Sequence, residues 1–292
     1  MAEEKINIIM LKKSETIGFF CIKASAYAGI LLLLAALALI GLAGYRVISW
    51  QFLTGLWQHQ DIAAGGIWPA ILGSFYLGVG VTLCSFPLGI GAAIYLTEYG
   101  RQNFWRRSIE VAIRNLAGVP SVVYGLFGLG VFVYLMRLGT SLLAAVLTLS
   151  AMTLPWIITA AVEALQAVPP ALRESSLALG ATKWQTNKHI VLPLALPASL
   201  TGGIVGIARA MGETAPIIIV GATFYLTTLP SSPLDKFMAL PYHAFILATQ
   251  HSDARAVEYA SGTALVLIVL VFILSLGAII LRYYFRSKYK IQ

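Results

Sequence analysis

The sequence predicts an all-α membrane protein with six transmembrane helices. Three observations lead to this fold class: 59% of the 292 residues are hydrophobic, only 11% are charged, and the mean hydropathy is +0.83. Soluble domains carry about 25% charged residues, so a water-soluble protein of this length could not cover its surface with so few charges. Most of the surface must therefore face lipid.

Six apolar stretches are long enough to cross about 30 Å of hydrocarbon at about 20 residues each. They cover residues 24–45, 70–96, 116–136, 140–161, 194–222 and 262–281. The first stretch starts only at residue 24 and is longer than the 7–15-residue core of a secretory signal. We therefore expect it to remain as the first transmembrane helix.

The third stretch has the weakest helical signal. Small or helix-breaking residues occur at Gly118, Pro120, Gly125, Gly128 and Gly130. In a bilayer, small residues let neighbouring backbones approach closely, so a helix is still expected here. Arg137 and Gly139 form the only break before the fourth stretch, which predicts a tight hairpin between the two helices.

The Lys and Arg residues are distributed unevenly between the two sets of loops. Fifteen of the 20 fall in the tails and in the alternate loops on the same side, and four fall in the opposite loops. Positive residues stay on the cytoplasmic side, so both termini are expected to be cytoplasmic. The net charge of +8 thus reflects topology and does not indicate nucleic-acid binding. The long loop at 224–261 then faces outward, with a short helix near residues 242–250.

Several chemistries lack their sequence signatures. No Gly-Lys-Ser or Gly-Lys-Thr motif follows the glycine-rich stretches, so ATP hydrolysis is expected only from a partner. Neither HExxH nor G-x-S-x-G occurs, which argues against the common membrane hydrolases. Cys21 and Cys84 have no metal-ligand spacing, and the four histidines are dispersed in loops. We expect no catalytic residue and no metal site.

The segment at residues 163–193 is too polar to span the membrane and too regular to be an unstructured loop. Pro169 and Pro170 can start a helix, and Gly180 can end it with a left-handed turn. A second short helix is expected at 181–190. The segment thus predicts a compact pair of helices at the membrane face.

Leu179, Ala181 and Trp184 lie near the tip of this predicted pair. Such a tip suits a groove in a partner protein. A pair of interfacial helices that rests on lipid headgroups has the same periodicity. The pattern alone leaves both interpretations open.

Two charged residues, Arg209 and Glu213, interrupt the fifth apolar stretch at a spacing of i, i+4. A charge near the bilayer centre costs about 2.5–3.5 kcal/mol on insertion scales, so both should face protein or water. Pro216 can kink the helix just beyond them. Small residues that allow a close neighbour occur at Gly202, Gly206 and Gly212.

The pair has two interpretations. Arg209 and Glu213 can simply neutralise each other within the bundle. Alternatively, Arg209 attracts an anion, and Glu213 accepts a hydrogen bond from a protonated anion oxygen. Phosphate carries such a proton at neutral pH and sulfate does not. Because intramembrane charges are functional by default, we favour the anion path.

The order Glu-Ala, Leu-Gly-Ala and Leu-Pro in the 163–193 segment resembles the loop signature of ABC importer permeases. The matching residues are Glu163, Ala164, Leu179, Gly180, Ala181, Leu192 and Pro193. The resemblance implies a coupling helix that docks into a cytoplasmic ATPase. The docking residues it implies are Glu163, Ala164, Arg173, Glu174, Leu179, Gly180, Ala181 and Trp184.

Two further motifs resemble the phosphate-import permeases of the PstA type: ARAMGETAP at 208–216 and LAGVPSVVYG at 116–125. The resemblance implies the type I ABC importer permease (MetI-like) fold, with Arg209, Glu213 and Thr214 along the substrate path. It implies three regions. These are an N-terminal tail, first helix and outer loop at 1–67, a permease core at 68–284 with its coupling loop at 163–193, and a cytoplasmic tail at 285–292.

The resemblance also implies partners and a location. The partners would be a homologous PstC-type permease, two PstB-type ATPases, a PstS-type extracytoplasmic phosphate-binding protein and membrane lipid. ATP and magnesium would bind the ATPases, so this chain needs no cofactor. The location would be the bacterial plasma (inner) membrane. Two alternatives remain: a permease of the same architecture for sulfate or molybdate, and a membrane enzyme or scaffold without transport.

Overall fold

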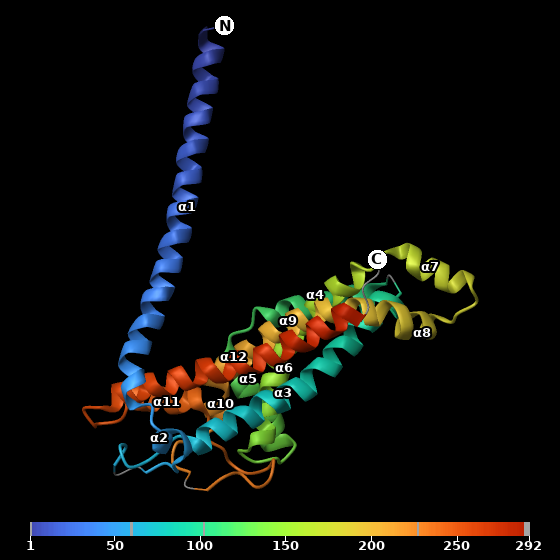
Figure 1. Cartoon of the computed structure of the whole chain (residues 1–292). Coiled ribbons are helices and arrows are strands. Elements are labelled where there is room, and N and C mark those ends of the chain that lie inside the picture. The colour runs from blue at the N-terminus through green and yellow to red at the C-terminus, as the bar shows by residue number, and fades with distance from the viewer. Residues whose placement is uncertain (1, 59–60, 102, 227, 289–292) are drawn as a thin grey trace.

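The computed structural model describes residues 2–58, 61–101, 103–226 and 228–288, and these residues form helices joined by loops (Figure 1). The α-helices are α1 (Ala2–Gly44), α2 (Trp50–Thr54), α3 (Trp68–Ile94), α4 (Phe104–Ala117), α5 (Ser121–Gly128), α6 (Leu142–Gln166), α7 (Pro170–Ala178), α8 (Lys183–Thr186), α9 (Leu192–Gly212), α10 (Ala215–Val220), α11 (Leu240–Thr249) and α12 (Ala256–Lys288). A 3-10 turn η1 (Tyr45–Val47) and π-helical stretches η2 (Tyr95–Tyr99), η3 (Leu129–Leu135) and η4 (Asn187–Val191) extend them. The described residues form no β-strand, which confirms the all-α class.

Five helical segments are long and apolar enough to cross a membrane. They are Gly18–Val47, Trp68–Tyr99, Leu142–Gln166, Lys183–Gly212 and Ala256–Phe285. Each overlaps one of the predicted stretches, in the order first, second, fourth, fifth and sixth. The apolar sequence therefore locates these helices correctly, although their ends differ by several residues.

The third predicted span is wrong at its start. The helix expected from residue 116 onward is broken, and α4 meets the segment Ser121–Leu135 at a bend of 108°. Pro120 causes the break, because proline has no backbone N–H and disfavours a helical conformation in the residue before it. Taken together, α4 and the apolar segment made of α5 and η3 are long and apolar enough to count as a sixth, broken span.

Helix α6 lies at the centre of the bundle, packed between α3 and α9. Its side chains Leu149 and Ile157 are fully buried. A side chain at Gly89 of α3 would collide with Ile157, and one at Gly202 of α9 would collide with Ala160. Glycines on both sides thus let neighbouring backbones approach α6, as the small-residue pattern predicts.

The hairpin between the third and fourth predicted spans is confirmed. Arg137 has a φ of 55° and Gly139 a φ of 66°, so the chain reverses through two left-handed residues. Glycine adopts this conformation without steric cost, whereas arginine does not. Beyond the turn, the Ser141 side chain accepts a hydrogen bond from the Ala144 amide and caps the start of α6.

Helix α1 stands away from the bundle over most of its length (Figure 1). It contacts α12 and η1 near its C-terminal end. At this crossing, a side chain on Gly44 would collide with the backbone of Ser261 and Gly262. The contact therefore depends on two glycines at the same point.

At the end of the bundle opposite α7, segments far apart in the chain come together (Figure 1). Their side chains form an aromatic cluster. The rings of Trp57, Phe224 and His243 lie 4.5–5.0 Å apart between centroids. His251 also contacts Trp57, at 6.4 Å. The prediction of dispersed loop histidines is therefore wrong for these two, because α11 folds back over the outer loops. Burial, helped by the nearby His251, lowers the pKa of His243 to about 3.

Candidate functional site

The fifth predicted span is not one helix. Helix α9 ends at Gly212, Glu213 has an extended backbone, and α10 starts at Ala215 with Thr214 as its N-cap. Pro216 lies in the first turn of α10, where its missing N–H costs nothing. The expected kink beyond Glu213 is therefore a break at Glu213 itself, because the proline begins a new helix.

Arg209 and Glu213 face each other across this break. The Arg209 Nε atom lies 3.6 Å from Glu213 Oε1, and the guanidinium carbon lies 5.1 Å from the centre of the Trp156 ring. The Arg209 side chain is 49% exposed and that of Glu213 is 18% exposed. Arg209 is thus positioned by an acid and an aromatic face, and half of it stays accessible.

The pair lies well inside the apolar layer. Trp156, which packs against Arg209, is 14 residues after the start of α6 and 10 residues before its end at Gln166. At 1.5 Å per residue, these segments measure about 21 Å and about 15 Å. Arg209 therefore lies level with the middle part of α6, although its own helix α9 ends three residues later, at Gly212.

The glycines around the pair have different surroundings. Gly202 and Gly206 of α9 pack against Ala160 and Ile157 of α6, as predicted. A side chain added at Gly212 would meet no atom within 4 Å. There is therefore open space beside Gly212, directly next to Glu213 in the chain.

Helices α7 and α8 project from one end of the bundle (Figure 1). We call α7, α8 and the turn between them the α7–α8 knob, residues 170–186. Gly180 makes the turn with a φ of 87°, which favours glycine. Thr182 and Gln185 form a capping box that starts α8. The predicted pair of short helices is confirmed, although the second continues through η4 into α9.

The tip of the α7–α8 knob presents large apolar side chains. Leu179 is 89% exposed and Trp184 is 62% exposed. Inside the knob, the Ser176 and Thr186 hydroxyls are 2.9 Å apart and join α7 to α8. Glu174 is exposed beside them. The knob is therefore a folded unit with an apolar tip, which suits a partner groove better than a loose loop would.

Arg173 points back toward the bundle. Its guanidinium donates to Glu98 Oε1 at 2.9 Å, to the Leu165 carbonyl at 2.7 Å and to the Val168 carbonyl at 2.6 Å. Arg173 therefore anchors the knob, whereas Leu179 and Trp184 form its outer surface. The sequence alone does not reveal the role of Glu98, because no local pattern links it to a residue 75 positions away.

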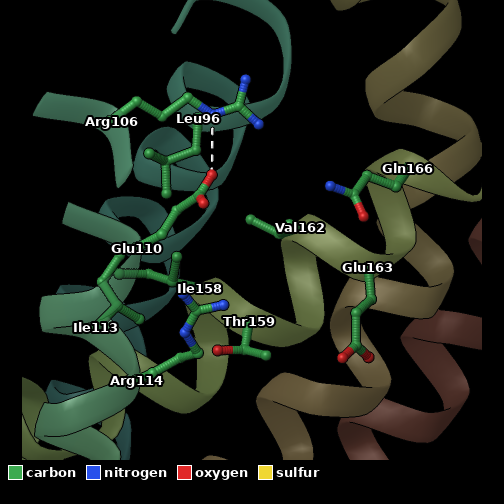
Figure 2. Close-up of a pocket in the computed structure, with 10 residues that line it drawn as sticks. All are labelled: Leu96, Arg106, Glu110, Ile113, Arg114, Ile158, Thr159, Val162, Glu163 and Gln166. Atoms are coloured by element: carbon green, nitrogen blue, oxygen red, sulfur yellow. Dashed lines mark hydrogen bonds and ion pairs between the residues drawn. The ribbon is translucent and has the colours of Figure 1, made fainter. Parts of the chain in front are cut away.

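Glu163 and Ala164 lie at the end of α6, outside the α7–α8 knob. Ala164 is buried in the bundle. Glu163 lines a pocket of about 250 Å³ between α4 and α6, together with Arg106, Arg114 and Gln166 (Figure 2). The coupling residues implied by the resemblance are thus distributed over the knob, this pocket (Glu163) and the buried interior of the bundle (Ala164).

No group of three His, Cys, Asp or Glu side chains that could hold a metal ion occurs within the described ranges. The charged groups at the break and in the pocket are guanidinium groups beside carboxylates. Such groups bind oxyanions.

A helical membrane bundle with a charged break inside one span and a projecting knob has the features of a transport subunit. Residues 85–291 match the family described as binding-protein-dependent transport system inner membrane component. The match covers more than half of the chain, so the protein belongs to this family of importer permeases. It is a multi-pass inner-membrane permease.

Several bacterial permeases are similar in sequence. The probable ABC transporter permease protein YqgI of Bacillus subtilis (strain 168) is 32% identical, over 87% of this chain and 92% of the relative. The probable permease protein YqgH of the same strain is 36% identical, over 82% and 79%. The phosphate transport system permease protein PstA 1 of Mycobacterium tuberculosis (strain H37Rv) is 33% identical, over 79% and 76%. The resemblance to PstA-type phosphate permeases is confirmed.

Solved structures share the fold. A chain of the MetNI methionine ABC transporter in an inward-facing conformation aligns with a TM-score of 0.58 at 18% identity, over 75% of this chain and 94% of that chain. A chain of a bacterial alginate ABC transporter aligns with a TM-score of 0.65 at 15% identity, over 89% and 92%. At this identity they show the fold alone. The MetI-like importer permease fold is therefore confirmed.

Proposed function

We propose that this chain is the PstA-type permease subunit of an ATP-driven importer of inorganic phosphate. The observation that supports it best is the half-exposed guanidinium of Arg209 deep in the apolar layer, 3.6 Å from Glu213. Relatives named as phosphate transport permeases cover most of the chain. A charge within the apolar layer is costly, and a role in anion transport would account for its presence there.

The chemistry of the pair fits phosphate. The Nε side of Arg209 faces Glu213, and the rest of the guanidinium can donate to anion oxygens. Glu213 is an acceptor when ionised, so it can take the hydrogen bond of a protonated phosphate oxygen. A fully ionised sulfate lacks that proton and meets the carboxylate as a like charge. Thr214, next in the chain, lies at the same break and adds a hydroxyl to the path.

The family supports an ATPase and a binding protein as partners, and the rest of the importer belongs to the proposal. A homologous PstC-type permease completes the path, and a PstS-type binding protein delivers phosphate at the α11 end. Two PstB-type ATPases bind ATP and magnesium and receive the α7–α8 knob. Both termini and the knob lie in the cytoplasm. ATP-driven closure of the ATPases moves the knob and switches the bundle between outward-open and inward-open states.

The test is anion uptake by the complete complex reconstituted in proteoliposomes, with ATP inside and the binding protein outside. We expect ATP-dependent uptake of labelled phosphate that excess unlabelled phosphate suppresses and excess sulfate leaves unchanged. Equal competition by sulfate or molybdate would support a permease for another oxyanion. Absence of any ATP-dependent uptake by an intact complex would support an enzyme or scaffold without transport.

A further inference from the structure

The pocket between α4 and α6 is separate from the break that holds Arg209. It encloses about 250 Å³ at the end of α6 that leads into the α7–α8 knob (Figure 2). Its polar lining comes from Arg106, Glu110, Arg114, Thr159, Glu163 and Gln166. Two arginines beside two glutamates repeat, in a second place, the chemistry of the Arg209–Glu213 pair.

The two arginines of this pocket differ in their partners. Arg106 is held by Glu110, with Nε 2.9 Å from Oε1, and by the Gly100 carbonyl at 3.2 Å. Among the described residues, the Arg114 side chain has no hydrogen-bond or ion-pair partner. Figure 2 shows its side chain reaching from α4 toward Thr159 of α6. Arg114 is therefore a guanidinium whose donors are available to a ligand.

One face of α6 connects this pocket to the Arg209 site. Trp156, Thr159, Glu163 and Gln166 follow each other at spacings of three and four residues, so they lie on one side of the helix. All four are exposed in the chain. Arg209 packs on Trp156 at one end of this stripe, and the polar lining of the pocket runs from Thr159, about 4.5 Å further along the helix, to Gln166, about 15 Å further along.

We propose that this pocket is a second anion site, where inorganic phosphate binds at the cytoplasmic end of the path before release. This second site rests on the proposed function, which supplies both the direction of transport, import, and the ligand, phosphate. Because phosphate inside the cell can occupy the same site, the site also makes import sensitive to internal phosphate.

The donors and acceptors fit a protonated oxyanion. Arg114 can donate two parallel hydrogen bonds to one phosphate, and the Gln166 amide can donate a third. Glu163 can accept the phosphate proton, which a sulfate would lack. The Thr159 hydroxyl donates to the Pro155 carbonyl at 2.8 Å, so toward the pocket it acts as an acceptor.

The experiment measures initial uptake by proteoliposomes that contain the complete complex and increasing amounts of luminal phosphate. In the wild type, luminal phosphate should inhibit uptake, and equal luminal sulfate should not. In Arg114→Gln, the half-inhibitory phosphate concentration should rise about tenfold, as expected for the loss of a charged hydrogen bond. Uptake into vesicles without luminal phosphate is measured for each variant as its own reference, so that only the dependence on luminal phosphate is compared.

Arg107→Gln is the matched control. Arg107 is an exposed arginine on the same helix but lines a different surface pocket with Phe104 and Ser108, so its loss should leave the inhibition unchanged. Gln166→Ala provides a second variant on α6 if Arg114→Gln does not assemble, and it should weaken the inhibition in the same direction.

Two results would overturn the second site: wild-type uptake that ignores luminal phosphate, or equal inhibition of the wild type and Arg114→Gln. A wild type that imports no phosphate would instead refute the proposed function. The luminal titration would then be made with the anion that the complex does import, and the same comparison of variants would decide the role of Arg114.

Discussion

Glu98 and Arg173 form an ion pair of 2.9 Å that joins η2, the extension of α3, to the first helix of the α7–α8 knob. The same guanidinium binds the carbonyls of Leu165 and Val168, at the end of α6. Both charged side chains are largely buried, with Arg173 21% and Glu98 13% exposed. The knob is therefore attached to two membrane helices through one side chain, and a force on the knob reaches both.

Arg173→Ala should uncouple transport from ATP hydrolysis. The change leaves Glu98 and two carbonyl groups without their donor, which should lower the stability of this junction by about 1–3 kcal/mol. We expect the amount of phosphate imported per ATP hydrolysed to fall several-fold, while ATP hydrolysis continues. Arg255→Ala, which breaks a 3.6 Å pair with Asp253 in the loop before α12, is the control and should not change the ratio. If Arg173→Ala imported as much phosphate per ATP hydrolysed as the wild type, the Arg173 contacts would not transmit motion from the knob to the membrane helices.

Arg209→Ala should strongly reduce transport without preventing assembly. The substitution removes the charged donors at the break, and uptake should decrease about 10- to 100-fold. Arg209→Lys keeps the charge but loses the planar fork, so a partial decrease is expected. Uptake and co-purification of the complex are measured together, with the exposed Lys236→Ala as control. Normal uptake by Arg209→Ala would show that the pair only neutralises itself.

Gly180→Asp should release the ATPase from the permease. The residue has a φ of 87°, so any side chain is strained there, and the position lies at the tip of the α7–α8 knob next to Leu179. Co-purification of the ATPase with a tagged permease measures the effect. Gly139→Asp tests the same backbone strain at a φ of 66° in the opposite hairpin, and the ATPase should remain bound. If the ATPase co-purified with both variants, the knob would not be part of the ATPase interface.

Gly202→Val should destabilise the bundle. A side chain at this position collides with Ala160, so α6 and α9 must separate. Overpacking of this kind costs about 1–3 kcal/mol. Thermal unfolding in detergent measures the effect. Gly91→Val is the control, because Gly91 of α3 has open space around it and should tolerate the change. Equal thermal unfolding midpoints for Gly202→Val and Gly91→Val would contradict the close packing of α6 against α9 at Gly202.

His243 should make the outer aromatic cluster sensitive to acid. Its folded pKa of about 3 lies below the unfolded value of about 6.5. The unfolded chain therefore binds the extra proton between these values. Stability is complete above about pH 6.5 and declines as the pH falls toward 3, by up to about 1.4 kcal/mol per pH unit.

The comparison is thermal unfolding in detergent at about pH 7.5 and about pH 5, on either side of the unfolded pKa. We expect the wild type to lose stability at the lower pH and His243→Phe to lose less. The exposed His189→Phe keeps the buried histidine and should behave like the wild type. If His243→Phe loses as much stability as the wild type, another group accounts for the loss.

Features fixed by local chemistry could be predicted from the sequence. The apolar stretches locate the spans, because about 20 residues of low polarity have few alternatives to a membrane helix. Pro169 and Pro170 mark the start of α7, and Gly180 marks the turn after it, because these residue types have such roles in many short helices. The charge pair at Arg209 and Glu213 stands out because charges are rare in such a stretch.

Features that depend on contact between distant segments could not be predicted. Hydropathy averages over a window, so it does not register the sharp bend at Pro120. The break at Glu213 has a local signal, since Gly212 and Pro216 flank it, but the same residues also fit a kinked helix. For Glu98 and Arg173, and for Trp156 beneath Arg209, no short-range pattern exists.

The joint between α9 and α10 has a consequence for the isolated chain. Between Gly212 and Ala215 the peptide groups cannot all pair within a helix, and at this depth a lipid tail offers no hydrogen bond. Each peptide group stranded in oil costs several kcal/mol. A single copy of the chain in the bilayer therefore leaves peptide groups at this joint without hydrogen-bond partners. Their cost in hydrocarbon favours association with a protein surface, or with water, that supplies those hydrogen bonds. The lipid hydrocarbon, which offers no hydrogen bonds, thus contributes to the assembly of the importer.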